Sequence, residues 1–532
     1  MPAPVVALNH LQTAQCHQLP EPAAQHVAGN PDPIAPVHEA HAALEGGAKD
    51  EKRPAVTHGN QGTRHRTCSD LTRCVHLASP PQTEYTPITQ VTPAHLAELL
   101  RPVGTRQLEA PMDFDFTPRV QQLRTQVSDF MDEYVVPTIP RWIAATNAGD
   151  SHPDFIEDLK ALARDEGLWN LFLPGLADDE PGQRLTNLEY APLAEIMGRV
   201  MWASEIFNCS APDTGNMEIL HLFATAEQRH QWLEPLLEGT IRSCFAMTEP
   251  DVASSDATNI MTSIRCSGDS YVINGRKWFS SGAANPRCTF AIVMGVTNPE
   301  ESSHRRQSMV IVPLDTPGVE VVRNIPVVNH LSLEGHCEII FKDVEVPVQN
   351  LILQEGAGFE IAQARLGPGR IHHCMRSIGQ CELALELLCE RAVERKTFGS
   401  YLHQHGTIAD WIARSRIDID QARLLVLKTA WMIDREGARG AAKEIAMIKA
   451  LVPRVQTEVS DRAMQVFGAM GLTSDTPLMS IWSWGRVLRI ADGPDEVHLR
   501  SIARREVRDA GSRRGSSAAY LTPPEVLAAA LD

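Results

Sequence analysis

Apolar residues return at steps of three and four from residue 117 onward, at Val120, Leu123, Val127, Phe130 and Met131. This spacing places them on one face of an amphipathic helix. The helix is entered through Thr117–Pro118, residue types suited to a helix cap and a first turn. The same pattern, broken by Pro and Gly, predicts further helical stretches at 153–167, 187–201, 212–223 and 226–238.

From about residue 244 the apolar period changes from three or four to two. Alternation of this kind is typical of strands with one buried face. A turn is expected at 316–318, where Thr, Pro and Gly follow one another. The predicted strands are 260–267, 269–274, 288–296, 308–314, 318–323 and 336–346.

After residues 355–358 the helical period returns over long stretches. A buried stripe is predicted from the apolar residues Ile445, Ile448, Val452, Val455, Val459, Ala463 and Val466. The order of elements predicts an α+β multidomain chain: an N-terminal helical domain, a middle β-barrel-like domain and a C-terminal four-helix bundle. The expected domains are 113–243, 244–353 and 354–510.

The two ends of the chain have a different composition. Residues 1–112 are rich in Pro, Ala and His with few periodic aliphatic residues, so we expect a disordered extension. Its histidines are irregularly spaced, which argues against a metal site. Residues 511–532 are expected to form a tail.

Charge and cysteine content narrow the class of protein. The 532 residues carry a net charge of −17, which argues against a general nucleic-acid or anionic-membrane binder. The eleven cysteines include no Cys-x-x-Cys pair, so neither a disulfide framework nor a structural zinc site is indicated. No apolar run is long enough to span a bilayer and no targeting signal is evident. We expect a soluble intracellular protein, cytoplasmic in a bacterium and mitochondrial or peroxisomal in a eukaryote.

Two short segments, 244–256 and 274–282, combine small hydroxyl residues, Pro, Gly and one aromatic pair at strand ends. Backbone N–H groups and hydroxyls can bond the polar edge of a flat aromatic cofactor, and Trp278 can stack on its face. A surface loop before a hairpin has a similar composition, so either segment alone is ambiguous.

Together, in this order and spacing, the segments resemble the flavin-binding middle domain of the acyl-CoA dehydrogenases. The resemblance implies FAD as cofactor. The first segment looks one residue longer than the common pattern and the second one residue shorter, and Ser255 is favoured over Ser254 for the substrate side. By this resemblance the residues that contact the flavin are Met247, Thr248, Ser255, Trp278, Phe279 and Ser280.

Two further motifs resemble family segments that reach the FAD of a neighbouring subunit. In 394–399 the resemblance assigns Arg395 to the pyrophosphate and Phe398 to the adenosine half. An Arg fork suits that task because it binds phosphate oxygens bidentately. In 465–471 it assigns Gln465 and Gly468, although a Gly-terminated helix is also common. A homodimer or homotetramer is thereby implied.

The segment 489–498 decides the chemistry. In most acyl-CoA dehydrogenases a Glu at this position removes the α-proton of the acyl thioester, and the matching residue here is Asp492. The other family position for the base is Gly369, which has no carboxylate. An Asp places its carboxylate roughly one ångström short, a shift that can cost about a hundredfold in rate without compensation. The alternative is a purely structural role, in which Asp492 caps the N-terminus of the following helix.

The resemblance assigns Pro494 and Glu496 to the cofactor, and Arg370, Ser255 and Gly493 to the substrate. Burial against the flavin is expected to raise the pKa of the Asp492 carboxyl. Neighbouring His372–Cys374 look like a metal cluster, but adjacent helix residues do not converge on one point, so no metal is expected.

The resemblance covers residues 115–510 and is strongest to the branch of family members ten and eleven. It implies α,β-desaturation of an acyl-CoA, as in fatty acid β-oxidation, with hydride transfer to flavin N5 and electrons leaving to an electron-transfer flavoprotein. Two alternatives stay open. One is a flavin-dependent oxidase of the same fold, since nitroalkane oxidases also use Asp; the other is a non-catalytic flavin-bearing binding protein.

Overall fold

The structure is a computed structural model that describes residues 115–150, 152–328, 335–515, 517 and 520–521. All of them belong to one unit of the chain that begins at Arg106. The predicted disordered extension and nearly all of the predicted tail beyond residue 515 lie outside the described residues.

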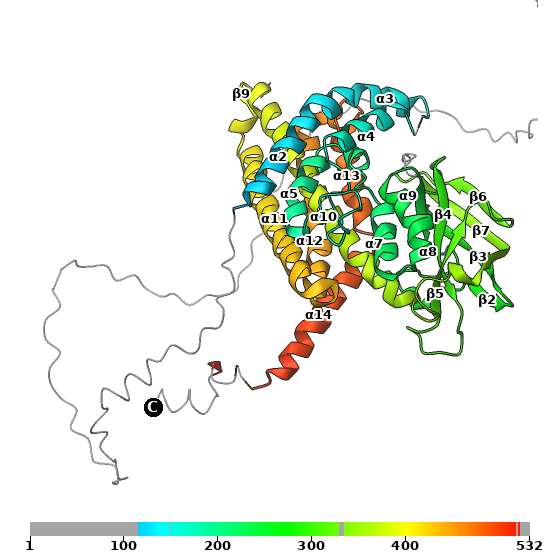
Figure 1. Cartoon of the computed structure of the whole chain (residues 1–532). Helices are drawn as coiled ribbons and strands as arrows, with labels where there is room; N and C mark the ends of the chain where they lie inside the picture. Colours follow the sequence, from blue (N-terminus) through cyan, green and yellow to red (C-terminus); the bar gives the residue numbers. More distant parts are fainter. Residues whose placement is uncertain (1–114, 151, 329–334, 516, 518–519, 522–532) are drawn as a thin grey trace, which may run out of the picture. The chain divides into compact units, whose positions relative to one another are not determined.

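The N-terminal part is helical, as predicted. Its first helix begins after Thr117, whose hydroxyl accepts a hydrogen bond from the backbone N–H of Val120, with Pro118 in the first turn. The helices of this part are α2 Pro118–Phe130, α3 Ile139–Asn147, α4 Phe155–Asp165, α5 Asn187–Gly198, α6 Ala203–Ile206, α7 Asp213–Phe223, α8 Ala226–Gln228 and α9 Glu234–Leu237. Short π- and 3-10 turns connect several of them (Figure 1).

The middle part is a seven-stranded sheet in the order β1-β4-β2-β3-β7-β6, with β5 paired to β4. The strands are β1 Arg242–Ala246, β2 Ser263–Ser267, β3 Ser270–Ser281, β4 Cys288–Val296, β5 Gln307–Pro313, β6 Val319–Asn324 and β7 His336–Pro347. The prediction ended β3 at residue 274, which was too early, because the strand continues through Trp278 to Ser281. Pairing with β7 holds these polar and aromatic residues in the sheet.

The C-terminal part consists of long helices. They are α10 Gly358–Glu394, α11 Gly406–Gly440, α12 Ala442–Phe467, α13 Leu478–Leu488 and α14 Asp495–Ser512, with a small hairpin of β8 Lys396–Thr397 and β9 Ser400–Tyr401 after α10. The predicted apolar stripe of α12 is buried along its whole length. The three-part fold class inferred from the sequence is therefore confirmed.

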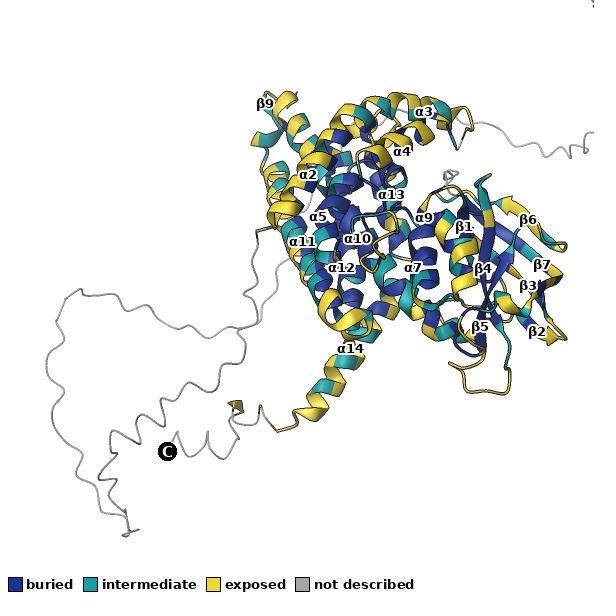
Figure 2. Ribbon diagram, in the orientation of Figure 1, coloured by how far each residue is buried: buried dark blue, intermediate teal, exposed yellow. Residues whose placement is uncertain are grey.

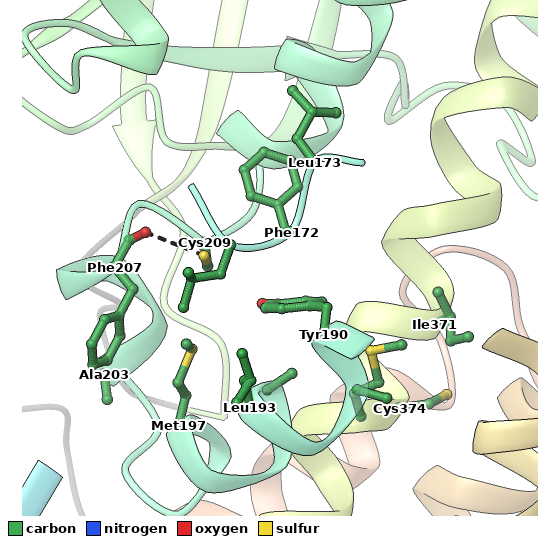
Figure 3. Close-up of a cluster of buried hydrophobic side chains, with 14 of the residues drawn as sticks. Phe172, Leu173, Tyr190, Leu193, Met197, Ala203, Phe207, Cys209, Ile371 and Cys374 are labelled. Atoms are coloured by element: carbon green, nitrogen blue, oxygen red, sulfur yellow. Dashed lines mark hydrogen bonds between the residues drawn. The ribbon is translucent and has the colours of Figure 1, made fainter. Parts of the chain in front are cut away.

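The helical parts share one hydrophobic core, and a second apolar cluster lies within the sheet. In Figure 3, Tyr190 and Leu193 of α5 lie beside Ile371 and Cys374 of α10, so the N-terminal helices pack on the first C-terminal helix. Figure 2 shows α10 and α12 largely buried, whereas α14 is mostly exposed. The core thus fixes α10, the helix that carries Arg365, Arg370 and His373.

Among the described residues, no helix combines the length and the apolar character that crossing a membrane requires.

Candidate active site

The two predicted flavin segments are hydrogen-bonded to each other. The Thr248 hydroxyl donates to the Trp278 carbonyl at 2.6 Å, and the Trp278 N–H donates to the Thr248 carbonyl at 3.0 Å. The loop that follows β1 is therefore attached to the middle of β3, so the motifs found separately in the sequence form one surface.

A buried ion pair lies beneath this surface. Lys277 is fully buried, and its Nζ is 2.8 Å from Oε1 of Glu249 and 2.8 Å from the Met247 carbonyl. Glu249 also accepts hydrogen bonds from the backbone N–H groups of Met261 and Thr262. Sequence reasoning missed this pair. The alternation of the strand could have indicated it, because Lys277 falls on the same face of β3 as the buried Ile273 and Tyr271.

The backbone at Phe279 is bulged. Lys277 pairs with Ile339 and Ser280 with Cys337, so β3 carries one more residue than β7 over this interval. Phe279 has φ of 49° and a half-exposed ring that meets Trp278 edge-on at 4.9 Å. A bulge re-aims side chains in this way, commonly near functional sites.

The Ser280 hydroxyl is buried and has no hydrogen-bond partner among the described residues. A buried hydroxyl without a partner is costly, so its presence favours a ligand with polar atoms at this place.

The serines of the first loop have separate environments. The Ser254 hydroxyl accepts a hydrogen bond from the Glu249 N–H at 2.9 Å and so holds the loop closed. Asp256 binds Thr258 and caps a short 3-10 turn. Ser255 is exposed, and its predicted role at the substrate stays a prediction.

Asp492 lies in a tight turn between α13 and α14. Asp492 and Gly493 both have positive φ, 56° and 105°, and Arg370 Nε donates to the Asp492 carbonyl at 2.9 Å. Lys449 donates to the carbonyls of Leu488 and Ala491 at 2.6 and 2.9 Å. The turn is thus anchored from α10 and α12, and the N-cap of α14 is Pro494 instead of Asp492. Glu496, in the first turn of α14, is exposed.

The pKa rise expected for Asp492 concerns burial against the flavin and stays a prediction; in the chain itself the pKa of this carboxyl is lowered. Burial acts to raise the pKa of this carboxyl, but positive or polar groups outweigh it and lower the pKa below its ordinary value. The carboxyl is therefore ionised, as a base requires. The cationic groups that lower it near pH 7 are Lys449, Arg365 and Arg370, and the His373 ring also faces the carboxyl.

Arg365 packs against the sheet, and its charge also lowers the pKa of the Asp492 carboxyl; sequence reasoning did not identify it. Its guanidinium lies 4.0 Å from the centroid of the Phe245 ring in β1, and Nε donates to Asn216 at 3.3 Å. A Cβ at Gly215 would meet Arg365 Nε at 2.9 Å, so the glycine leaves room for it. Burial of the neighbouring Glu218 raises its pKa well above the ordinary value.

The histidines predicted to be ordinary helix residues differ from each other. His372 is buried and packs edge-on against Tyr190 and Phe172, at 5.2 and 5.9 Å between ring centroids. His373 instead has Nε2 at 3.6 Å from Oδ2 of Asp492. The prediction fits His372, whereas His373 faces the candidate base. Among the described residues no cluster able to hold a metal ion is found.

The residues predicted to reach a neighbouring subunit are exposed. Phe398 and Gly399 both have positive φ and form the turn between β8 and β9, with Phe398 98% exposed. Such a two-residue turn suits a tight hairpin. Arg395, Gln465 and Gly468 are exposed too.

The helix ends that precede segment 394–399 and carry segment 465–471 are in contact. Arg391, near the end of α10, stacks over the ring of Phe467 at the end of α12, 5.2 Å from its centroid.

The comparisons identify the class of protein. Models of the acyl-CoA dehydrogenase N-terminal, middle and C-terminal domains match residues 117–240, 244–344 and 356–507. The chain therefore belongs to the acyl-CoA dehydrogenase family, a family of flavoprotein oxidoreductases.

Within the family, the chain is 56% identical over 401 residues to "Probable acyl-CoA dehydrogenase FadE2" of Mycobacterium tuberculosis, covering 74% of this chain and 97% of that protein. It is 51% identical over 436 residues to acyl-CoA dehydrogenase family member 11 of Gallus gallus, covering 78% of this chain and 55% of that protein. The matched region thus spans about half of that longer relative.

A solved structure described as an acyl-CoA dehydrogenase from Mycobacterium abscessus matches with a TM-score of 0.72 and 47% identity, over 74% of this chain and all of that one.

Proposed function

We propose that this protein is an FAD-dependent acyl-CoA dehydrogenase that introduces an α,β double bond into an acyl-CoA thioester. The observation that carries the proposal is the Asp492 turn. It holds an ionised carboxylate, and its backbone is anchored from α10 and α12. Arg365, whose charge acts on that carboxylate, packs against the strand that leads into the predicted flavin loop. FAD, when bound, supplies the acceptor at N5 for the hydride that leaves the β-carbon.

The residues present fit a flavin. Ser280 offers a buried hydroxyl without a partner, and the bulge turns the Trp278 and Phe279 rings into an edge-on pair. Thr248 and Met247 lie on the adjoining loop, where backbone groups can bond the polar edge of the ring. Ser255, Pro494 and Glu496 complete the proposed set on this chain.

Asp492 takes the α-proton in this proposal. No described residue accepts a hydrogen bond from its backbone N–H, so that group is free to donate to the thioester oxygen as negative charge develops there. Arg370 holds the turn from the carbonyl side of Asp492. Gly493, which has no side chain, is proposed to let the backbone approach the acyl group. The positive groups around Asp492 keep it ionised until the α-proton arrives.

A second copy of the chain completes the site in this proposal. Exposed Arg395, Phe398, Gln465 and Gly468 would meet the pyrophosphate and adenosine of the neighbour's FAD, which implies a homodimer or homotetramer. The proposed electron acceptor is an electron-transfer flavoprotein.

The test is anaerobic mixing of the flavin-loaded protein with straight-chain acyl-CoAs of graded length. We expect bleaching of the oxidised flavin band, and Asp492→Asn should slow bleaching by about a hundredfold or more because it removes the base. A nitroalkane serves as the second substrate class. Bleaching by the nitroalkane alone, or unchanged turnover in Asp492→Asn, would refute the proposal.

A further inference from the structure

Three cationic or basic residues follow one side of α10 toward the Asp492 turn. Arg370, His373 and Arg376 are spaced three apart, so neighbouring members lie next to each other on the helix surface. Arg370 binds the Asp492 backbone, and His373 Nε2 lies 3.6 Å from the Asp492 carboxylate. The His373 side chain is 12% exposed, and its ring centroid is 6.0 Å from that of Trp484.

Arg376 fixes which ring nitrogen of His373 carries the hydrogen. Its Nη2 is 3.1 Å from His373 Nδ1, and a guanidinium can only donate, so Nδ1 must be the acceptor. Burial and the Arg376 charge lower the pKa of His373 to about 3, so the ring is neutral near pH 7. The single ring hydrogen is then on Nε2, the nitrogen that faces Asp492.

The Asp492 carboxylate needs such a partner. Its backbone is held at φ 56° by Arg370, yet no described group donates a hydrogen bond to the carboxylate oxygens. At 3.6 Å the His373 contact is just longer than a hydrogen bond. Hydrogen bonds at catalytic groups commonly tighten only when the substrate is bound.

We propose that His373 is a positioning residue for Asp492: its Nε2–H closes onto the carboxylate when the site is filled and sets the direction from which this short base meets the α-proton. The inference rests on the proposed function of Asp492. Arg376 acts on Asp492 only through His373, because it fixes the tautomer of that ring. Arg376 in turn donates a hydrogen bond to the Cys209 carbonyl at 3.3 Å.

His372 shows what a purely structural histidine looks like in the same helix. No described group forms a hydrogen bond with either of its ring nitrogens, and its ring packs between aromatic side chains. In His373 both nitrogens face charged partners. The two residues therefore form a matched pair for mutation.

The test compares three variants of the flavin-loaded protein. His373→Leu removes the donor at similar volume, whereas His373→Gln keeps an N–H near the place of Nε2. His372→Leu is the control. We expect His373→Leu to lower kcat by about tenfold to a hundredfold with little change in KM, because the carboxylate is misdirected. His373→Gln should recover most of the loss, and His372→Leu should leave kcat within about twofold.

Two measurements separate positioning from a structural role. An α-deuterated acyl-CoA should show a larger isotope effect in His373→Leu, since proton removal becomes slower. Nitrogen-15 spectra of histidine-labelled protein, assigned by the signal lost in His373→Gln, should show Nε2 protonated and Nδ1 unprotonated. The spectra also test the assignment if His373→Leu does not fold.

Three results would overturn the inference: unchanged kcat in His373→Leu, equal losses in His373→Leu and His373→Gln, or a hydrogen on Nδ1. Failure of the proposed function has a different signature, because wild-type protein would then fail to reduce its flavin with any acyl-CoA.

Discussion

The Lys277–Glu249 ion pair should hold the predicted flavin loop on β3, and Lys277→Met tests this. Both side chains are buried, and Nζ is 2.8 Å from Oε1. Removing one partner of a buried pair costs about 3–5 kcal/mol. Glu249 keeps the backbone N–H groups of Met261 and Thr262, so we expect the lower end, about 3 kcal/mol.

The assay is amide hydrogen exchange of the peptide that contains Met261 and Thr262. A loss of about 3 kcal/mol corresponds to roughly a hundredfold faster exchange through local opening. The flavin retained after gel filtration should fall in parallel, because the opened loop carries Thr248. The control is Arg276→Met on the adjacent, exposed side of β3, where the partner is Glu338. If exchange and flavin content of the two variants match, the reasoning is refuted.

The difference in exchange protection between wild type and Lys277→Met should depend on pH in a defined direction. Burial lowers the pKa of Lys277 to about 8, with Glu249 acting in the opposite direction. An unfolded Lys titrates near 10.4, so between about pH 8 and 10 the opened chain binds more protons than the closed one. The protection of wild type relative to Lys277→Met, measured at equal pH, should therefore widen as pH rises through this range.

Two further predictions concern turns. Gly493→Ala should destabilise the Asp492 turn by about 1–3 kcal/mol, because φ is 105° and the new Cβ would lie 3.0 Å from His498 Nε2. Thermal unfolding measures this against Gly511→Ala, where a Cβ meets open space. Phe398→Ser should leave the unfolding of the chain unchanged, because the side chain is 98% exposed, but should reduce oligomer size in sedimentation and flavin retention. An unaltered oligomer with full flavin would contradict the proposed role of Phe398.

The sequence determined the order of elements and the class of protein. Apolar periods of three to four and of two located α2, β4 and the buried stripe of α12, because the side-chain geometry of helices and strands is local. Local motifs also pointed to the family, since residues adjacent along the chain form each recognisable segment. The end of β3 was missed because its polar residues are kept in the strand by β7.

Only the tertiary structure decided how the charged residues act together. The contact of His373 with Asp492, the lowered pKa of that carboxyl and the ion pair of Lys277 with Glu249 join residues far apart in sequence. Burial and the positions of neighbouring charges set such properties, and neither is encoded in a local period. The sequence therefore identified Asp492 as the candidate base, whereas the packing of α10 against its turn decided which side chains surround it.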